Sequence, residues 1–185
     1  MFYITVDSDI RLEHTYIHHA QDIFHLVSKE QNRTLFRQWL PWVEHNTTID
    51  DTQAFIQTTL EKYAKAQEVN CSIFYQDKLV GNVSLLGMRN SPNDTQKGEL
   101  GYWLDVDHHG KGIMKRAVKK MLEIGFTYYH LDKISIKCAT QNHRSCNIPQ
   151  SLGFKYEGTL RADIMVEGIV QDGKVYSLLK EEYQA

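Results

Sequence analysis

The residues best suited to chemistry lie in a short stretch where Gly110 and Gly112 flank Lys111. A strand is predicted for residues 98–106, just before this stretch, and a helix with one basic face for residues 111–126. The first N–H groups of a helix have no partner within it, and together with the helix dipole they attract an anion. Glycine lets a phosphate approach the backbone closely. The pattern predicts an anion site, with a plain tight turn before a solvated basic helix face as the alternative.

Two familiar phosphate-binding patterns do not fit this stretch. A triphosphate loop needs the string G-x-x-x-x-G-K-S/T, which the sequence lacks. A dinucleotide fingerprint needs a third glycine where Lys115 stands. It also needs an acidic residue at the end of the next strand, whereas Asp132 precedes that strand. The loop alone therefore does not say which anion is bound.

The whole chain has the composition of an ordinary globular protein. It has 185 residues, 42% of them hydrophobic and 24% charged, and a formal net charge of -2. This charge gives no basic field for nucleic acid, and no apolar run approaches the length of a membrane span. No secretory signal is evident at the start, so a cytoplasmic location is expected.

Cysteine and histidine spacing gives no metal or disulfide pattern. The three cysteines, Cys71, Cys138 and Cys146, are odd in number and lack C-x-x-C spacing, which argues against a disulfide framework and a structural zinc. His14 and His18 are four residues apart, but no carboxylate or cysteine pattern completes a site. We expect no metal.

The order of predicted elements indicates one α/β (mixed α+β) domain over residues 1–185. Helical spacing runs through residues 18–40 and 48–67, with Asp50 or Asp51 as cap candidates for the second helix. A hairpin with its turn at 77–78 follows, and residues 89–98 are expected to form a surface loop. The other predicted elements are a strand at 10–13, the strand and helix around the glycine loop, a strand at 133–140, a short helix from Ser145 and strands at 154–160 and 174–182. We expect a mixed central sheet of about six to seven strands flanked by about four helices.

Several blocks, in order, resemble one family. The string "DHHGKG" resembles the Q/R-x-x-G-x-G/A loop of the GNAT acetyltransferase superfamily. "RTLFRQWLPW", "GELGYWLDVDHHGKGIMKRAVKKML", "NHRSCNIPQSLGFKYEGTLR" and "GKVYSLL" resemble blocks of its ribosomal-protein N-terminal (Rim-type) group. The resemblance covers about residues 10–182, and its blocks are specific together although each is weak alone.

The resemblance implies acetyl-CoA as cosubstrate, with its pyrophosphate on the glycine loop. It also implies a central strand that splays from its parallel neighbour, so that pantetheine pairs with free strand amides. The backbone N–H near Leu104 would then donate to the tetrahedral oxyanion. The coenzyme-binding residues that the resemblance indicates are Trp103, Leu104, Val106, His109, Gly110, Lys111, Gly112, Ile113, Met114 and Asn142.

Acetyl transfer to an amine needs a base, because the attacking amine must be neutral. Glu99 shares a face of its strand with Trp103, and a partly buried carboxylate there would have a raised pKa suited to a base. The alternative for Glu99 is a salt bridge to a helix lysine or arginine. Ser145 is a weaker candidate for the acid that protonates the thiolate, and it could instead be only a helix cap. The sequence departs from the family at Pro149, where many members have a tyrosine acid, and at Ile164, where Rim-type enzymes often have a glutamate.

The function expected from this resemblance is N-acetylation of a protein N-terminus, with ribosomal proteins among the acceptors. Acetylation of a small amine, such as a polyamine or an aminoglycoside, stays open, and so does a non-catalytic acyl-CoA-binding module. The expected partners are acetyl-CoA and a peptide or small amine, without nucleic acid or membrane. The oligomeric state is left open, a homo-oligomer included.

Overall fold

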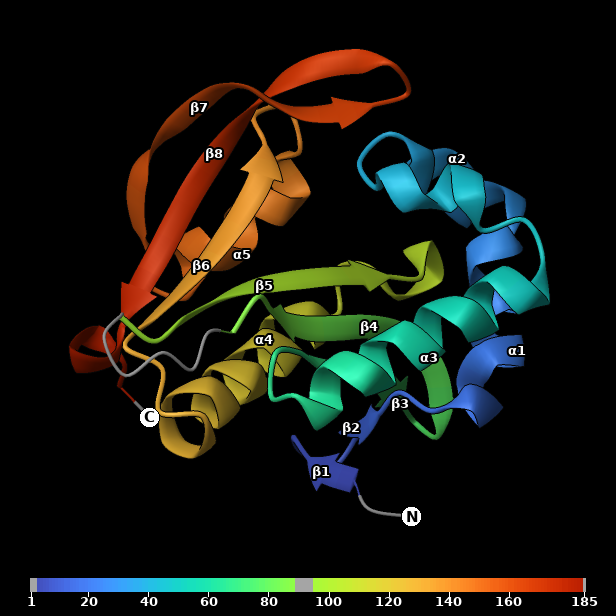
Figure 1. Cartoon of the computed structure of the whole chain (residues 1–185), viewed down its shortest axis with the longest axis horizontal. Coiled ribbons are helices and arrows are strands. Elements are labelled where there is room, and N and C mark those ends of the chain that lie inside the picture. Colours follow the sequence, from blue (N-terminus) through green and yellow to red (C-terminus); the bar gives the residue numbers. More distant parts are fainter. Residues whose placement is uncertain (1–2, 89–94, 185) are drawn as a thin grey trace.

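The computed structural model describes residues 3–88 and 95–184. Eight strands form one sheet in the order β1-β2-β3-β4-β5-β6-β8-β7 (Figure 1). They are β1 (Tyr3–Thr5), β2 (Ile10–His14), β3 (Val69–Tyr75), β4 (Lys78–Leu86), β5 (Lys97–Leu104), β6 (Lys133–Ala139), β7 (Lys155–Val166) and β8 (Ile169–Leu179). Only β5 and β6 are parallel among these neighbouring pairs, which fits the helical crossover between them.

Within the described residues, five α-helices cover the sheet. They are α1 (Ala20–Ser28), α2 (Glu30–Arg37), α3 (Ile49–Ala64), α4 (Ile113–Glu123) and α5 (His143–Ser151). Short 3-10 segments lie at Ile17–His19, Pro41–His45, Val106–His108 and Lys180–Glu182, and a π-helical turn follows α4 at Ile124–Tyr128. The mixed sheet flanked by helices is therefore confirmed. The sheet has more strands than expected, in part because β1 is three exposed residues long, too short to show a periodic pattern.

Two hydrophobic clusters lie on the sheet. One joins α4 and α5 to the central strands, with Leu100 and Leu104 of β5 in it. The other joins α1, α2 and α3 to residues of β3 and β4, and Trp103 of β5 packs against it. Successive side chains of a strand point to opposite faces, so β5 contributes to both clusters. The strand that ends at the glycine loop is thereby fixed from both sides.

The cap of α3 and the position of the hairpin turn differ by a few residues from those expected from the sequence. The cap of α3 is Thr48, whose Oγ1 accepts from the Asp51 N–H at 3.3 Å, while the Asp51 carboxylate accepts from the Thr48 N–H at 2.8 Å. This reciprocal capping box explains why an aspartate resembled the cap. The hairpin turn lies at Gln76 and Asp77, whose φ angles of 48° and 63° are those of a type I′ turn, and β4 begins at Lys78.

The expected helical block at 18–40 is divided into α1 and α2. Lys29, between them, has an extended ψ of 131°. Of the expected loop at 89–98, residues 89–94 lie outside the described residues, and β5 begins at Lys97. Within residues 3–88 and 95–184, no helix has the length and apolar character needed to span a membrane.

Candidate active site

β5 and β6 start side by side and then separate (Figure 1). Parallel pairing joins only Lys97–Glu99 to Lys133–Ser135. β5 nevertheless stays paired with β4 as far as Leu104. A cavity of about 870 Å³ lies where the two strands diverge, with walls from β5, β6, α2, α5 and the glycine loop.

The open edge of β5 presents backbone groups to this cavity. The Asp105 N–H donates to the Val80 carbonyl of β4 at 2.8 Å. Because N–H directions alternate along a strand, the Leu104 N–H points away from β4, toward the side that β6 has left. Leu104 also lines the cavity. An extended ligand could therefore pair with β5 there as an added strand would.

The glycine loop combines an unusual backbone conformation with open space. Gly110 and Gly112 have φ angles of 76° and 69°, in the region that side chains rarely adopt. A Cβ built on either glycine would meet nothing within 4 Å. In the described part of the chain, the amides of Gly110, Lys111 and Gly112 donate to no backbone acceptor. Since α4 begins at Ile113, its unpaired first amides add to this group and favour an anion.

His109 joins the strand end to α5. Arg144 Nη1 lies 3.0 Å from His109 Nδ1, and an arginine can only donate. The Nδ1 atom therefore accepts, and Nε2 carries the proton that it donates to the Leu104 carbonyl at 3.0 Å. The ring holds the loop against the open edge of β5, so its nitrogens already have partners within the protein.

A buried polar network fixes α2 to the same loop. Asn32 donates to Asp105 Oδ1 at 2.7 Å and accepts from the Val106 N–H at 2.9 Å. Lys29 and His108 approach Asp105 Oδ2 at 3.2 and 3.0 Å. Burial alone would raise the pKa of Asp105, but these hydrogen bonds lower it overall. The charged carboxylate thus links the helix layer over β5 to the loop that precedes α4.

Glu99 lies at the closed end of the divergence, opposite Leu86 of β4 and Ser135 of β6. Its side chain is half-buried, and burial raises its pKa above the usual value. Asp163 raises this pKa further, whereas the ammonium of Lys137 lowers it. Lys137 is paired with Asp163 at 3.1 Å, and no ion pair within residues 3–88 and 95–184 involves Glu99. The salt bridge to a helix cation considered for Glu99 is therefore not found there.

Two hydroxyl groups meet on the α5 side of the cavity. Tyr102 Oη donates to the Ser145 carbonyl at 3.0 Å, and Ser145 Oγ donates to Tyr102 Oη at 3.3 Å. Burial raises the pKa of Tyr102, so its hydroxyl stays protonated. Ser145 is not the cap of α5. Asn142 is, because its Oδ1 accepts from the Ser145 N–H at 3.1 Å.

On the face of β5 opposite to Tyr102, Trp103 contacts the aromatic rings of Phe36 and Trp42. The ring centroid of Trp103 is 5.6 Å from that of Phe36 and 6.4 Å from that of Trp42.

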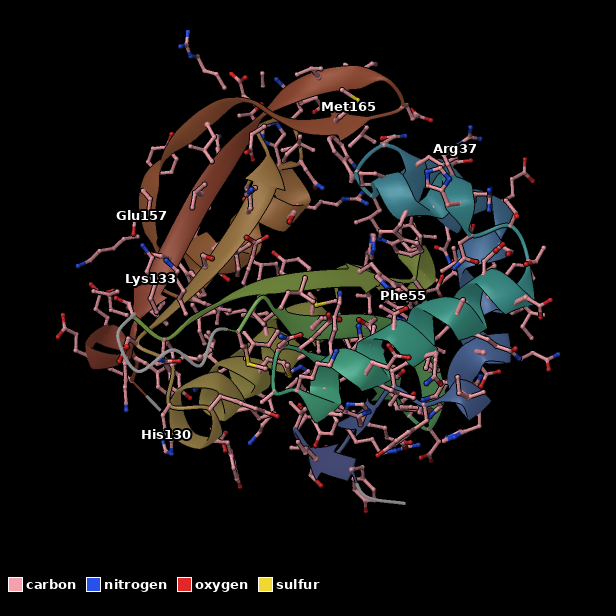
Figure 2. All side chains as sticks on the ribbon, viewed as in Figure 1. Arg37, Phe55, His130, Lys133, Glu157 and Met165 are labelled. Carbon is pink, nitrogen blue, oxygen red and sulfur yellow. The ribbon has the colours of Figure 1, made fainter. Side chains whose placement is uncertain are left out.

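The hairpin of β7 and β8 arches toward α2, and Arg37 Nε lies 3.5 Å from Glu167 Oε1 in the hairpin turn. Figure 2 shows Arg37 on α2 across from the hairpin that carries Met165. The cavity is thus bordered by elements far apart in the sequence.

Most of the residues predicted for the site line this cavity. Those that do are Trp103, Leu104, His109, Gly110, Gly112, Ile113, Met114, Asn142 and Ser145. Glu99, Val106 and Lys111 are not among its lining residues, and the exposed Lys111 instead places Nζ 5.8 Å from the ring centroid of Tyr75. The structure locates both family departures: Pro149 is buried within α5, and Ile164 lines the cavity.

The sequence reasoning missed Tyr102, Lys137 and Arg144. Tyr102 could have been found, because it alternates with Trp103 on a strand already assigned to the site. Lys137 lies on the same face of β6 as Ser135, which pairs with Glu99. Its place near the site could not be predicted, because the sequence does not show how β6 is aligned with β5. Arg144 gave no signal, since its contact with His109 arises only when α5 folds back over the loop.

One group of described side chains has ligand atoms close enough for a metal ion, within 4.8 Å: Glu13, His18 and His19. His19 Nδ1 accepts from the Tyr16 N–H at 3.2 Å, so the neutral ring carries its proton on Nε2. Nε2 faces Glu13 Oε2 at 3.4 Å, which suits a contact between the two side chains better than a shared metal. The expected absence of a metal stays a prediction.

Comparison with known proteins gives the site a family context. "Putative ribosomal N-acetyltransferase YdaF" of Bacillus subtilis (strain 168) is 30% identical over 155 residues, which is 83% of each chain. The ribosomal-protein-serine acetyltransferase of Escherichia coli (strain K12) is 26% identical over 174 residues, 94% of each chain. The solved structure of RimL, a ribosomal α-N-protein acetyltransferase in complex with coenzyme A, superposes with a TM-score of 0.90 at 22% identity. That superposition covers 96% of this chain and 98% of RimL, and it shows a shared fold.

A family model settles the membership. The model described as "Acetyltransferase (GNAT) domain" matches residues 9–155. That range includes the diverging strands, the glycine loop and α5. The chain therefore belongs to the GNAT acetyltransferase family and is an N-acetyltransferase.

Proposed function

We propose that the protein transfers the acetyl group of acetyl-CoA to the α-amine at a protein N-terminus, and that ribosomal proteins provide the acceptor. The observation that carries the proposal is the divergence of β5 and β6 beside a glycine loop with free amides. A pyrophosphate suits the loop, and an amide-containing chain suits the open edge of β5. The relatives named for ribosomal-protein acetylation support the choice of acceptor.

The amine is activated by Glu99 in this mechanism. An α-amine has a pKa near 8, so only about a tenth of it is neutral at pH 7. Glu99 does not line the cavity, and it therefore accepts the proton through an intervening water. Its raised pKa makes it a stronger base than an exposed glutamate.

The neutral amine attacks the thioester carbonyl directly. The Leu104 N–H on the open edge of β5 donates to the oxyanion that forms. Collapse of the intermediate breaks the carbon–sulfur bond and leaves an amide and a thiolate. The Ser145 hydroxyl, which contacts that of Tyr102, donates its proton to the thiolate and recovers one from the attacking nitrogen, which must lose its surplus proton to become a neutral amide.

A panel of acceptors tests this function. Peptides with free N-terminal Ser, Ala or Met are compared with N-blocked peptides that keep one lysine, and with spermidine, by thiol release and mass spectrometry. We expect acetylation of free α-amines and none of internal lysines. Acetylation of spermidine alone would assign the protein to small-amine substrates. Binding of acetyl-CoA without transfer to any of them would indicate a non-catalytic module.

A further inference from the structure

Two thiols meet at the wall of the cavity. Cys138 lies on β6 and lines the cavity, and Cys146 lies on α5. Their Sγ atoms are 2.7 Å apart, and the Cys146 thiol also lies 3.6 Å from the Ala139 carbonyl. Both are free cysteines. Since bonded sulfurs are separated by about 2.05 Å, a disulfide would require an approach of less than about 1 Å.

We propose that Cys138 and Cys146 form a disulfide-exchange site for small disulfides that enter the cavity, with the disulfide of CoA as the preferred reactant. The preference for that disulfide rests on the proposed function, because it depends on coenzyme recognition. The exchange itself depends only on the two thiols.

The reaction proceeds in two balanced steps. The Cys138 sulfur attacks one sulfur of CoA disulfide, and a mixed disulfide of Cys138 and CoA forms. The departing CoA thiolate takes the proton from Cys138. The Cys146 sulfur then attacks Cys138 Sγ, so the Cys138–Cys146 bond forms and a second CoA thiol leaves with the proton of Cys146. Two protein thiols are oxidised, and one CoA disulfide is reduced to two thiols.

Geometry sets this order of events. Both thiols are buried, but Cys138 lines the cavity and Cys146 does not. Burial raises the pKa of Cys138, and the contact with Cys146 raises it further, so the first attack is slow at neutral pH. A CoA adduct on Cys138 would occupy the cavity, and attack by Cys146 clears it.

The test follows the mass of the intact protein treated with CoA disulfide at pH 8.5 over several hours. We expect the unaltered protein to lose two hydrogens and release two CoA thiols. Cys146→Ser should keep one CoA adduct, whereas Cys138→Ser should gain no adduct. Cys71→Ser is the matched control, because Cys71 is also buried but has no thiol partner among the described residues, and this variant should behave as the unaltered protein. Cys138→Ala and Cys146→Ala replace either serine variant that does not fold.

Hydroxyethyl disulfide provides a second arm that needs no coenzyme recognition. If both reactants cause the Cys138–Cys146 disulfide to form, and CoA disulfide does so at the higher rate, the full proposal is supported. Equal rates would keep the thiol pair but remove the preference for CoA, and would count against the proposed coenzyme site. A lasting adduct on the unaltered protein, or no reaction with either disulfide, would overturn the proposal.

Discussion

The two edges of β5 differ, because one is paired with a neighbouring strand and the other is largely open, where we propose that the coenzyme binds. On one edge β4 pairs with β5 from Glu99 to Leu104, whereas on the other β6 pairs only with Lys97–Glu99. Both edges belong to the same eight residues, so the difference does not come from the composition of β5. It comes from the path of β6, which leaves β5 after Ser135 but stays paired with β8 as far as Ala139. One strand can thus be a rigid support along one edge and leave its other edge open for the proposed ligand.

A similar contrast separates the two ends of the cavity. At the loop end, backbone conformation determines the site, through two glycines with positive φ. At the hairpin end, side chains determine it, through Lys137, Asp163 and the contact of Arg37 with Glu167. We expect substitutions at the loop end to alter coenzyme binding, and those at the hairpin end to alter the acceptor step.

The largest effect is expected for Glu99→Gln at the junction of the two edges. Loss of the base should lower kcat by roughly 10²–10⁴. Glutamine keeps the size of the side chain, so coenzyme affinity, measured by calorimetry, should change little. Activity equal to that of the unaltered protein at every pH would remove Glu99 from the mechanism.

The loop end is tested by Gly112→Val. A β-branched residue at a φ of 69° costs roughly 1–3 kcal/mol of backbone strain, and its side chain would enter the open space beside the loop. Acetyl-CoA should raise the Tm of the unaltered protein, since it binds only the folded state, and the variant should lose most of this shift. Gly87→Val is the control, because Gly87 has a similar φ of 61° and open surroundings but does not line the cavity. Equal ligand shifts in both variants would contradict a specific role for the loop.

The glycine loop, the open edge of β5 and the contact that fixes α2 also differ in how far they could be predicted from sequence. The loop could be predicted because its signal is local: glycines, a strand before them and a helix after them. The open edge of β5 came only from family resemblance, since no periodicity within one strand shows where a neighbouring strand departs. The contact that fixes α2 to the loop joins Asn32 and Asp105, 73 residues apart, and nothing in the local pattern marks it.

Local competition explains the smaller errors. Ser145 and Asn142 are both residue types that can cap a helix. Asn142 is the cap because α5 begins at His143, directly after it. Asp51 resembled a cap because it takes the reciprocal part of one. Such choices shift an element by a few residues without altering the fold.

The two charged side chains near Glu99, Lys137 and Asp163, should shift its pKa in opposite directions. Lys137 lowers the pKa of Glu99 and Asp163 raises it. A base must be ionised, so activity falls as the pH drops through this pKa. Lys137→Met should therefore move the acidic limb of kcat/KM to higher pH, and Asp163→Asn should move it to lower pH, each by up to about one unit. Shifts in the same direction would show that the limb belongs to another group.

The smallest effect is expected where α2 meets the hairpin. Arg37 contacts Glu167 in the hairpin turn and Glu44 beside its own helix, and all three side chains are substantially exposed. Exposed ion pairs contribute little, so Glu167→Gln should raise KM for a peptide acceptor by about fivefold or less, with kcat and coenzyme affinity unchanged. Glu44→Gln removes the same charge from the same arginine without touching the hairpin, and it should leave KM unaltered. Steady-state kinetics with one good peptide measures both variants. If they raise KM equally, the effect comes from the charge of Arg37 and not from its link to the hairpin, and the hairpin end would then lose its part in holding the acceptor.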